Sequence, residues 1–113
     1  MSVMRLAVLV IAVACVAVTA CNTAESARPR LELVDAPATK DVAALVTTEL
    51  ARAASAHKRL LVYVGAAWCE PCRRFHDAAM AGQLDADFGD LRLLVFDADR
   101  DTDALQRAGY ISK

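Results

Sequence analysis

Two cysteines separated by two residues are the part of this 113-residue chain best suited to chemistry. Cys69 and Cys72 stand in the run Trp68-Cys69-Glu70-Pro71-Cys72. A disulfide that closes only about four residues stabilises a fold by roughly 2 kcal/mol, against about 4.7 kcal/mol for a loop of 100 residues. A purely structural bridge is therefore a weak explanation. We expect thiol–disulfide exchange, in which Cys69 attacks a disulfide and Cys72 resolves the mixed disulfide that results.

The elements on either side of the pair must position it. Residues 59–65, Arg-Leu-Leu-Val-Tyr-Val-Gly, are rich in strand formers and predict a strand buried on both faces of a mixed or parallel sheet. Pro71 suits the first turn of a following helix, which continues at helical spacing through Cys72, Phe75, Ala79 and Met80. Cys69 would then lie at a helix N-terminus, where free N–H groups and the helix dipole lower the pKa of a thiol below its usual value of about 8.5.

The other segments alternate between strand and helix, which predicts an α/β fold. The apolar face of the first helix is formed by Val42, Leu45, Val46, Leu50 and Ala53. The predicted elements are a short strand at 31–34, a helix from Asp41 to about His57, a short helix at 84–88 after a break at Gly82, a strand at 91–96 and a helix from about Thr102 to Ala108.

Composition limits the chain to one small domain without an electrostatic signature. The chain has 13 basic and 14 acidic residues and a net charge of −1. No basic run stands out, so neither nucleic-acid binding nor a charged membrane-binding surface is indicated. Much of the 57% hydrophobic content lies near the N-terminus and in an alanine-rich helix.

The N-terminus has the three parts of a secretory signal. One positive charge within the first five residues precedes the apolar run 6–18, and small residues follow. The run is too short for a transmembrane helix, which needs roughly 18 apolar residues. The order Val18-Thr19-Ala20-Cys21 resembles the lipobox of bacterial lipoproteins and predicts lipidation of Cys21. The alternative is an ordinary signal with Cys21 as a stray thiol in the linker.

These features predict a signal peptide at 1–20, an anchor cysteine and linker at 21–30, and a folded domain at 31–113 in the bacterial cell envelope, on the periplasmic side. Cys15 would be removed with the signal and Cys21 blocked by lipid, which leaves Cys69 and Cys72 free to form a disulfide outside the cytoplasm.

A metal site or a haem attachment site fits these residues less well than thiol–disulfide exchange does. A metal site needs about four ligands, and the mature chain offers two thiols, His57 and His76. A c-type haem would need histidine directly after Cys72, where Arg73 stands. No metal or other cofactor is therefore predicted.

Charged residues around the pair act in opposite directions. Glu70 would raise the pKa of a neighbouring thiolate, whereas Arg73 and Arg74 would lower it if they folded back. The alternating aspartates at 97, 99, 101 and 103 lack the glycine and glutamate of a calcium loop, so a turn and a helix N-cap explain them better.

Residues 61–75, Leu-Val-Tyr-Val-Gly-Ala-Ala-Trp-Cys-Glu-Pro-Cys-Arg-Arg-Phe, resemble the active-site segment of the thioredoxin family. Strand, tryptophan, Cys-x-Pro-Cys and helix occur in the same order, and a looser similarity extends from 31 to 113. The resemblance implies a thioredoxin-like βαβαβα arrangement with a central mixed sheet. It also implies that Trp68 flanks the nucleophile and helps to form the surface on which partner proteins dock.

Two features depart from that family. Many thioredoxins carry a buried aspartate six residues before the first cysteine, which assists proton transfer from the second, and Tyr63 stands there. The family fold also continues through a cis-proline that would fall just after Lys113. We therefore expect the N-terminal portion of the fold only, incomplete at the C-terminus. It would have an exposed sheet edge, unburied apolar faces at Val62, Val64 and Leu93, and a tendency to aggregate or become molten.

The predicted function is that of an extracytoplasmic, membrane-tethered thiol–disulfide oxidoreductase, whose only redox group is the Cys69–Cys72 disulfide. Its partners would be disulfide-bearing or dithiol protein substrates and a redox partner protein. Two alternatives remain: a non-catalytic protein that binds a metal or a partner through the dithiol, and an inactive truncated thioredoxin-like product.

Overall fold

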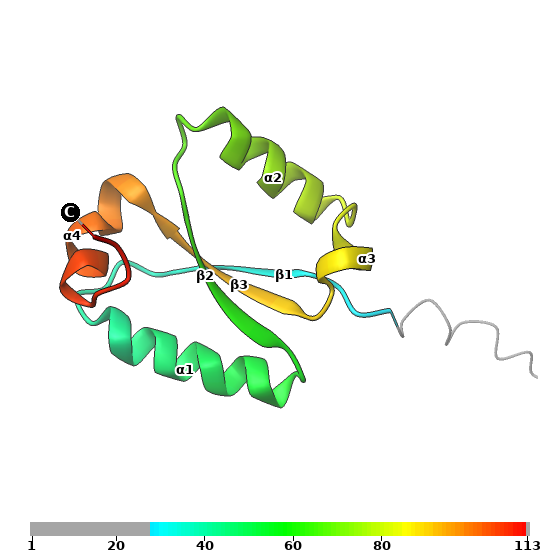
Figure 1. Ribbon diagram of the computed structural model, residues 1–113, viewed down its shortest axis with the longest axis horizontal. Helices are drawn as coiled ribbons and strands as arrows, with labels where there is room; N and C mark the ends of the chain where they lie inside the picture. The colour runs from blue at the N-terminus through cyan, green and yellow to red at the C-terminus, as the bar shows by residue number, and fades with distance from the viewer. Residues whose placement is uncertain (1–27, 113) are drawn as a thin grey trace, which may run out of the picture.

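A computed structural model describes residues 28–112 (Figure 1). The predicted signal peptide at 1–20 and the lipidation candidate Cys21 lie outside these residues. Within them, no helix is long and apolar enough to cross a membrane. The elements in chain order are β1 (Glu32–Asp35), α1 (Val42–Ser55), β2 (Arg59–Gly65), α2 (Glu70–Met80), α3 (Asp85–Phe88), β3 (Leu91–Asp97) and α4 (Ala98–Arg107).

The strands form one sheet in the order β1-β3-β2. Both pairings are parallel, and Leu93 of β3 stands in register with Leu33 on one side and Leu61 on the other. The α/β class is confirmed, but the predicted mixed sheet is wrong for residues 28–112. Helical crossovers return the chain to the same end of the sheet before each new strand, which makes the strands parallel. All three strands therefore end at one edge.

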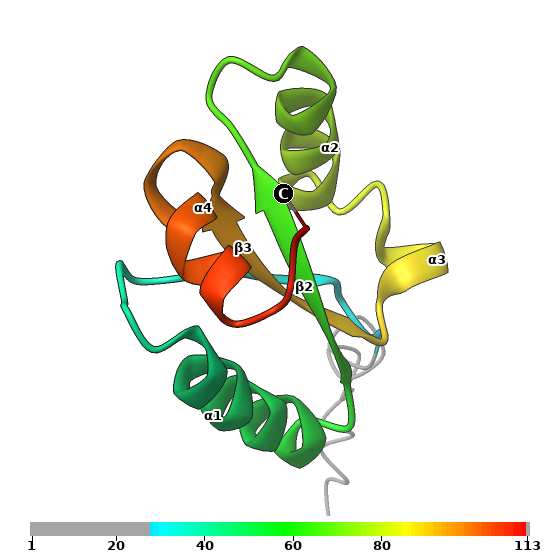
Figure 2. The same cartoon turned by 60° about the vertical axis from the view of Figure 1, so that its left-hand side comes forward.

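Helices cover both faces of the sheet (Figures 1 and 2). Alternate side chains of β3 point to opposite faces. Leu94 and Phe96 are buried with residues of α1 and α4 on one face, whereas Leu93 is buried with Ala79 of α2 on the other. The core thus consists of two apolar layers with β3 between them.

The central strand is β3, and the sequence alone made no prediction of the strand order. Leu93 is 1% exposed, so the prediction that it lacks cover is wrong, and Val62 and Val64 are half-buried against the α1 face. Among the described residues β2 pairs on one side only, and Leu61 is 49% exposed. The predicted burial of 59–65 on both faces is therefore wrong, because β2 forms the edge of the sheet.

The apolar face predicted for α1 contains one error. Val42 and Ala53 are buried and Leu45 and Val46 are half-buried, but Leu50 is exposed. Its neighbour Glu49 is buried instead, because two arginines compensate its charge. On α2, the predicted apolar position Met80 is also exposed.

Side-chain caps and glycine set several boundaries. α4 begins at Ala98, four residues before the predicted start, because the Asp97 carboxylate accepts the N–H groups of residues 99 and 100 at 2.9 Å each. The predicted aspartate N-cap is thus confirmed for Asp97, whereas Asp99, Asp101 and Asp103 lie within α4. α2 ends at Met80, and Gly82 takes a φ of +75°, a left-handed conformation that suits glycine.

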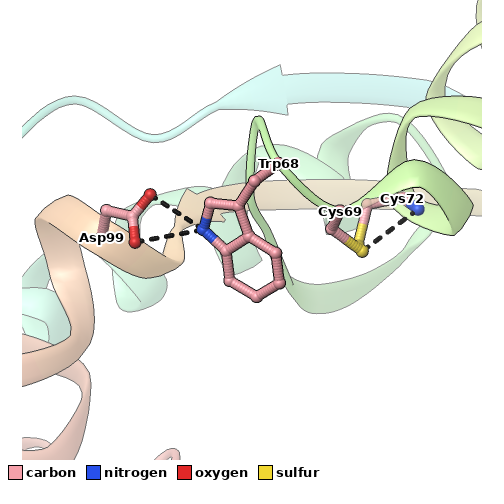
Figure 3. Close-up of a disulfide and its surroundings, with 4 residues drawn as sticks. All are labelled: Trp68, Cys69, Cys72 and Asp99. Atoms are coloured by element: carbon pink, nitrogen blue, oxygen red, sulfur yellow. Dashed lines mark hydrogen bonds between the residues drawn. A yellow bond between two sulfur atoms is a disulfide. The ribbon is translucent and has the colours of Figure 1, made fainter.

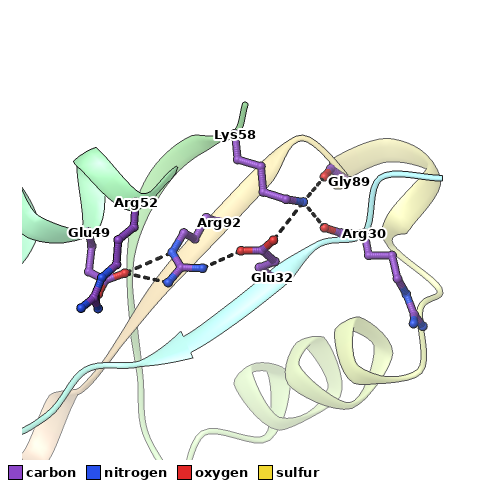
Figure 4. A network of polar contacts seen from close by, with 7 residues as sticks. All are labelled: Arg30, Glu32, Glu49, Arg52, Lys58, Gly89 and Arg92. Carbon is purple, nitrogen blue, oxygen red and sulfur yellow. Dashed lines mark hydrogen bonds and ion pairs between the residues drawn. The ribbon is translucent and has the colours of Figure 1, made fainter. Parts of the chain in front are cut away.

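An ion-pair network ties α1 to the sheet near the amino ends of the strands (Figure 4). Glu49 accepts hydrogen bonds from Arg92 of β3 at 2.9 and 3.1 Å and from Arg52 at 2.6 Å. Arg92 also donates to Glu32 of β1 at 2.6 Å. Lys58 lies 3.7 Å from Glu32. Burial raises the pKa of Glu49, but the hydrogen bonds from Arg92 and Arg52 outweigh it and hold that pKa below its ordinary value.

Candidate active site

The two predicted active-site cysteines form a disulfide where β2 leads into α2 (Figure 3). β2 ends at Gly65, and Cys69 is the N-cap residue of α2. The Cα atoms of Cys69 and Cys72 are 5.2 Å apart. The backbone N–H of Cys72 donates to Cys69 Sγ at 3.3 Å. The predicted position of the pair at a strand-to-helix junction is confirmed.

The geometry gives the two sulfurs different surroundings. Cys69 Sγ receives a helix N–H, an interaction that favours a thiolate, whereas Cys72 lies inside the first turn. Pro71 stands in that turn as predicted, at a position where its missing N–H leaves no intrahelical bond unmade. The arrangement suits attack by Cys69 and resolution by Cys72.

Trp68 presents its indole to solvent beside Cys69 and is 74% exposed (Figure 3). Its Nε1–H donates to the Asp99 carboxylate at 3.1 and 3.3 Å. Sequence reasoning missed Asp99 as a partner. Asp99 follows β3 and Trp68 follows β2 in the sequence. Because parallel strands bring their carboxyl ends to one edge of the sheet, residues just after two such strands can be expected to lie close together.

Glu70 is compensated within its own helix. Its carboxylate lies 2.6 Å from Arg73 Nη2 and 3.2 Å from Arg74 Nε, and all three side chains are largely exposed. Both arginines therefore contact Glu70, the residue that would otherwise oppose a thiolate at Cys69.

A cavity of about 440 Å³ lies beside Cys72 at the carboxyl ends of the strands. After β2 the chain leads to α2 on one face of the sheet, and after β3 it leads to α4 on the other face. The cavity therefore lies at a topological switch point, where α/β proteins commonly bind ligands. Polar lining side chains come from all three strands and from α2 and α4: Asp35, Tyr63, Arg73, His76, Asp97 and Arg100.

Tyr63 occupies the position six residues before Cys69. Its ring packs against Phe75 with centroids 5.2 Å apart. A Cβ atom at Gly65 would lie 3.2 Å from the Tyr63 ring and 4.0 Å from Cys72 Cβ. Gly65 therefore lies next to both the Tyr63 ring and Cys72, and a larger residue there would crowd the ring.

The aspartates after β3 have structural partners. Asp101 is buried and accepts from Arg100 at 2.7 and 2.8 Å and from the N–H of Asp97 at 2.9 Å. The hydrogen bond from Arg100 outweighs burial and lowers the pKa of Asp101. Arg100 also donates to the Ala36 carbonyl at 2.7 Å, which fastens α4 to the end of β1.

The two histidines lie far apart along the sheet. His76 lines the cavity near Cys72, whereas His57 follows α1 and precedes β2 with a φ of 55°. In the part of the chain from 28 to 112, no group of three His, Cys, Asp or Glu side chains is arranged to hold a metal ion.

No family model matches the chain, and no solved structure matches it significantly.

Proposed function

We propose that this chain is a thioredoxin-like thiol–disulfide oxidoreductase that acts outside the cytoplasm on a membrane tether. The observation that carries the proposal is the Cys69–Cys72 disulfide at the start of α2, where the Cys72 N–H donates to Cys69 Sγ. A disulfide of this span contributes little to stability, and the backbone N–H favours negative charge on the Cys69 sulfur.

The reaction needs only the two thiols and a substrate disulfide. Cys69 thiolate attacks one substrate sulfur, so that a Cys69–substrate bond forms and the substrate S–S bond breaks. The departing thiolate takes up a proton. Cys72 thiolate then attacks Cys69 Sγ, the Cys69–Cys72 bond forms, the Cys69–substrate bond breaks, and the second substrate sulfur leaves as a thiolate that takes up a proton. Two electrons pass to the substrate, and a dithiol partner protein restores the reduced pair; the reverse sequence oxidises a dithiol.

The surroundings of the pair suit a protein substrate. Trp68 provides an exposed aromatic surface next to Cys69, and its hydrogen bond to Asp99 restrains the indole. Exposed aromatic side chains are favoured where proteins bind one another. The apolar run at 6–18 and the lipobox-like Val18-Thr19-Ala20-Cys21 support export and lipid anchoring.

Substitution of each cysteine tests the proposal. The assay is reduction of insulin by dithiothreitol, with the full chain in detergent and with Cys15 and Cys21 replaced by serine. Cys69→Ser is expected to return turnover to the uncatalysed rate, because a serine hydroxyl is not a nucleophile without an activating base. Cys72→Ser, reduced beforehand and mixed with insulin after the dithiothreitol has been removed, is expected to accumulate a mixed disulfide with insulin, visible by mass spectrometry.

The chain with Cys15 and Cys21 replaced but the pair intact is the matched control and should retain the wild-type rate. Undiminished turnover by Cys69→Ser would refute the mechanism. Stoichiometric retention of Cu(I) or Zn(II) by the dithiol form, without exchange activity, would favour the metal-binding alternative instead.

A further inference from the structure

The cavity beside the disulfide joins Cys72 to a histidine on its own helix. Cys72 and His76 are four residues apart on α2, which places them on one helix face. Both line the 440 Å³ cavity, and His76 is exposed, so water can reach the space between them. We infer that His76 accepts the proton of the Cys72 thiol, through cavity water, when Cys72 resolves the mixed disulfide. The inference rests on the proposed function.

Cys72 needs such an acceptor more than Cys69 does. The backbone N–H of Cys72 donates a hydrogen bond to Cys69 Sγ. This bond favours a thiolate at Cys69 and does nothing for the sulfur of Cys72. An ordinary thiol with a pKa of about 8.5 is only roughly 3% ionised at pH 7. Complete ionisation could therefore speed the attack by Cys72 up to about 30-fold at that pH.

Other groups at the cavity are poorer acceptors at neutral pH. Arg73 and Arg100 are cations without an acceptor site. Tyr63 offers only a phenolic oxygen, which is a weaker proton acceptor than an imidazole nitrogen. Imidazole is the side chain that exchanges protons most readily between pH 5 and 8.

The two carboxylates at the cavity lie on other elements. Asp97 Oδ1 is occupied by the N–H groups that begin α4. Asp35 ends β1, which is separated from β2 by the central strand. His76 is the only proton acceptor among the cavity-lining residues that shares a helix with Cys72.

The proton and electron balance of the step is complete. Cys72–SH gives its proton through water to neutral His76, which becomes imidazolium. The Cys72 thiolate attacks Cys69 Sγ, the Cys69–Cys72 bond forms, and the bond from Cys69 to the substrate sulfur breaks. The substrate leaves as a thiolate and can receive the proton that His76 holds, so that the site returns to its starting charge.

A single-turnover reaction with 5,5′-dithiobis(2-nitrobenzoate) isolates this step. The reduced full chain, with Cys15 and Cys21 replaced by serine, releases one thionitrobenzoate when Cys69 attacks and a second when Cys72 resolves. Stopped-flow absorbance separates the two phases. His76→Gln is expected to slow the second phase roughly tenfold at pH 7, and by less than about twofold at pH 9.5, where the thiol ionises unaided. The first phase should stay unchanged.

Two further variants sharpen the test. His57→Gln removes the histidine at the far end of β2 and should leave both phases at wild-type rates. His76→Ala should recover a faster second phase when free imidazole is added, because the cavity can admit it.

The inference fails if His76→Gln resolves at the wild-type rate at pH 7, or if its second phase is slowed equally at both pH values, as a structural defect would do. It also fails if Tyr63→Phe, and not His76→Gln, causes the slowing. The reaction with 5,5′-dithiobis(2-nitrobenzoate) needs no protein partner. If the chain does not act on protein disulfides, only the insulin assay would therefore show it.

Discussion

At the scale of single residues, the contact between Trp68 and Asp99 links the loop before α2 to the first turn of α4. Both carboxylate oxygens lie within 3.3 Å of the indole Nε1. The indole ring of Trp68 remains exposed, while the hydrogen bond from its Nε1–H to Asp99 restrains its orientation. Asp99 therefore positions a surface beside Cys69 without contacting either sulfur.

Replacement of Asp99 by alanine should weaken substrate docking more than chemistry. A hydrogen bond in a solvent-exposed position contributes about 0.5–1.5 kcal/mol. For insulin reduction we therefore expect KM to rise roughly twofold to tenfold with little change in kcat. Asp103→Ala, on the exposed side of the same helix, is the control. Loss of kcat at constant KM would contradict the positioning role.

At the scale of elements, α1 is held to the sheet by charge as well as by apolar packing. The helix contributes Glu49, and the sheet contributes Arg92 from β3 and Glu32 from β1 (Figure 4). Buried charges are tolerated when they are paired and hydrogen-bonded. The network explains how a helix that exposes Leu50 can bury a carboxylate one residue earlier.

Removal of the Glu49 charge should make stability less dependent on pH. The folded-state pKa of Glu49 lies below its ordinary value. The charge therefore stabilises the fold above the unfolded-state pKa of about 4.3, and this contribution is lost as the pH falls through the folded-state value. We expect Glu49→Gln to cost roughly 1–3 kcal/mol at pH 7, with the difference from wild type closing in acid.

Urea unfolding at a series of pH values measures this difference. Asp90→Asn, which breaks an exposed pair with Arg59, is the matched control and should cost less than about 1 kcal/mol. A constant difference between Glu49→Gln and wild type from neutral pH into acid would show that the charge is not responsible.

At the scale of the whole molecule, the parallel sheet brings distant segments to one edge. The disulfide follows β2, while Asp97 and Asp99 lie at the end of β3 and just after it, and Asp35 ends β1. Within residues 28–112, the same topology leaves β2 at the border of the sheet, where Leu61 and Phe88 line an apolar cavity of about 250 Å³. An apolar edge of this kind favours self-association, so the expected tendency to aggregate stays a prediction.

Two leucines in register test this arrangement of the strands. Leu93 and Leu61 are direct partners across β3 and β2, but one is buried and the other half exposed. Leu93→Ala should cost about 2–5 kcal/mol, as buried leucines do, and Leu61→Ala roughly half of that or less. Urea unfolding measures both. Equal losses would contradict the edge position of β2, and the absence of any cooperative transition would support the expected molten state.

The sequence by itself determined the local features of this protein. The cysteine pair, the strand before it, the helix whose first turn holds Pro71 and the break at Gly82 follow from spacing, turn chemistry and capping within a few residues. Such features depend on neighbours along the chain, so they can be read without knowledge of the fold. The start of α4 was missed because several aspartates could have served as its cap.

Only the tertiary structure decided which strand is central, which leucines are buried and which distant side chains meet. Leu93 and Leu61 look alike in sequence, but Leu93 lies on the central strand and is buried with Ala79 of α2, whereas Leu61 lies on the edge strand β2 and is half exposed. The pairing of Trp68 with Asp99, and the cavity that joins Cys72 to His76, depend on where parallel strands end. These choices result from long-range packing of apolar faces, which residue spacing does not encode.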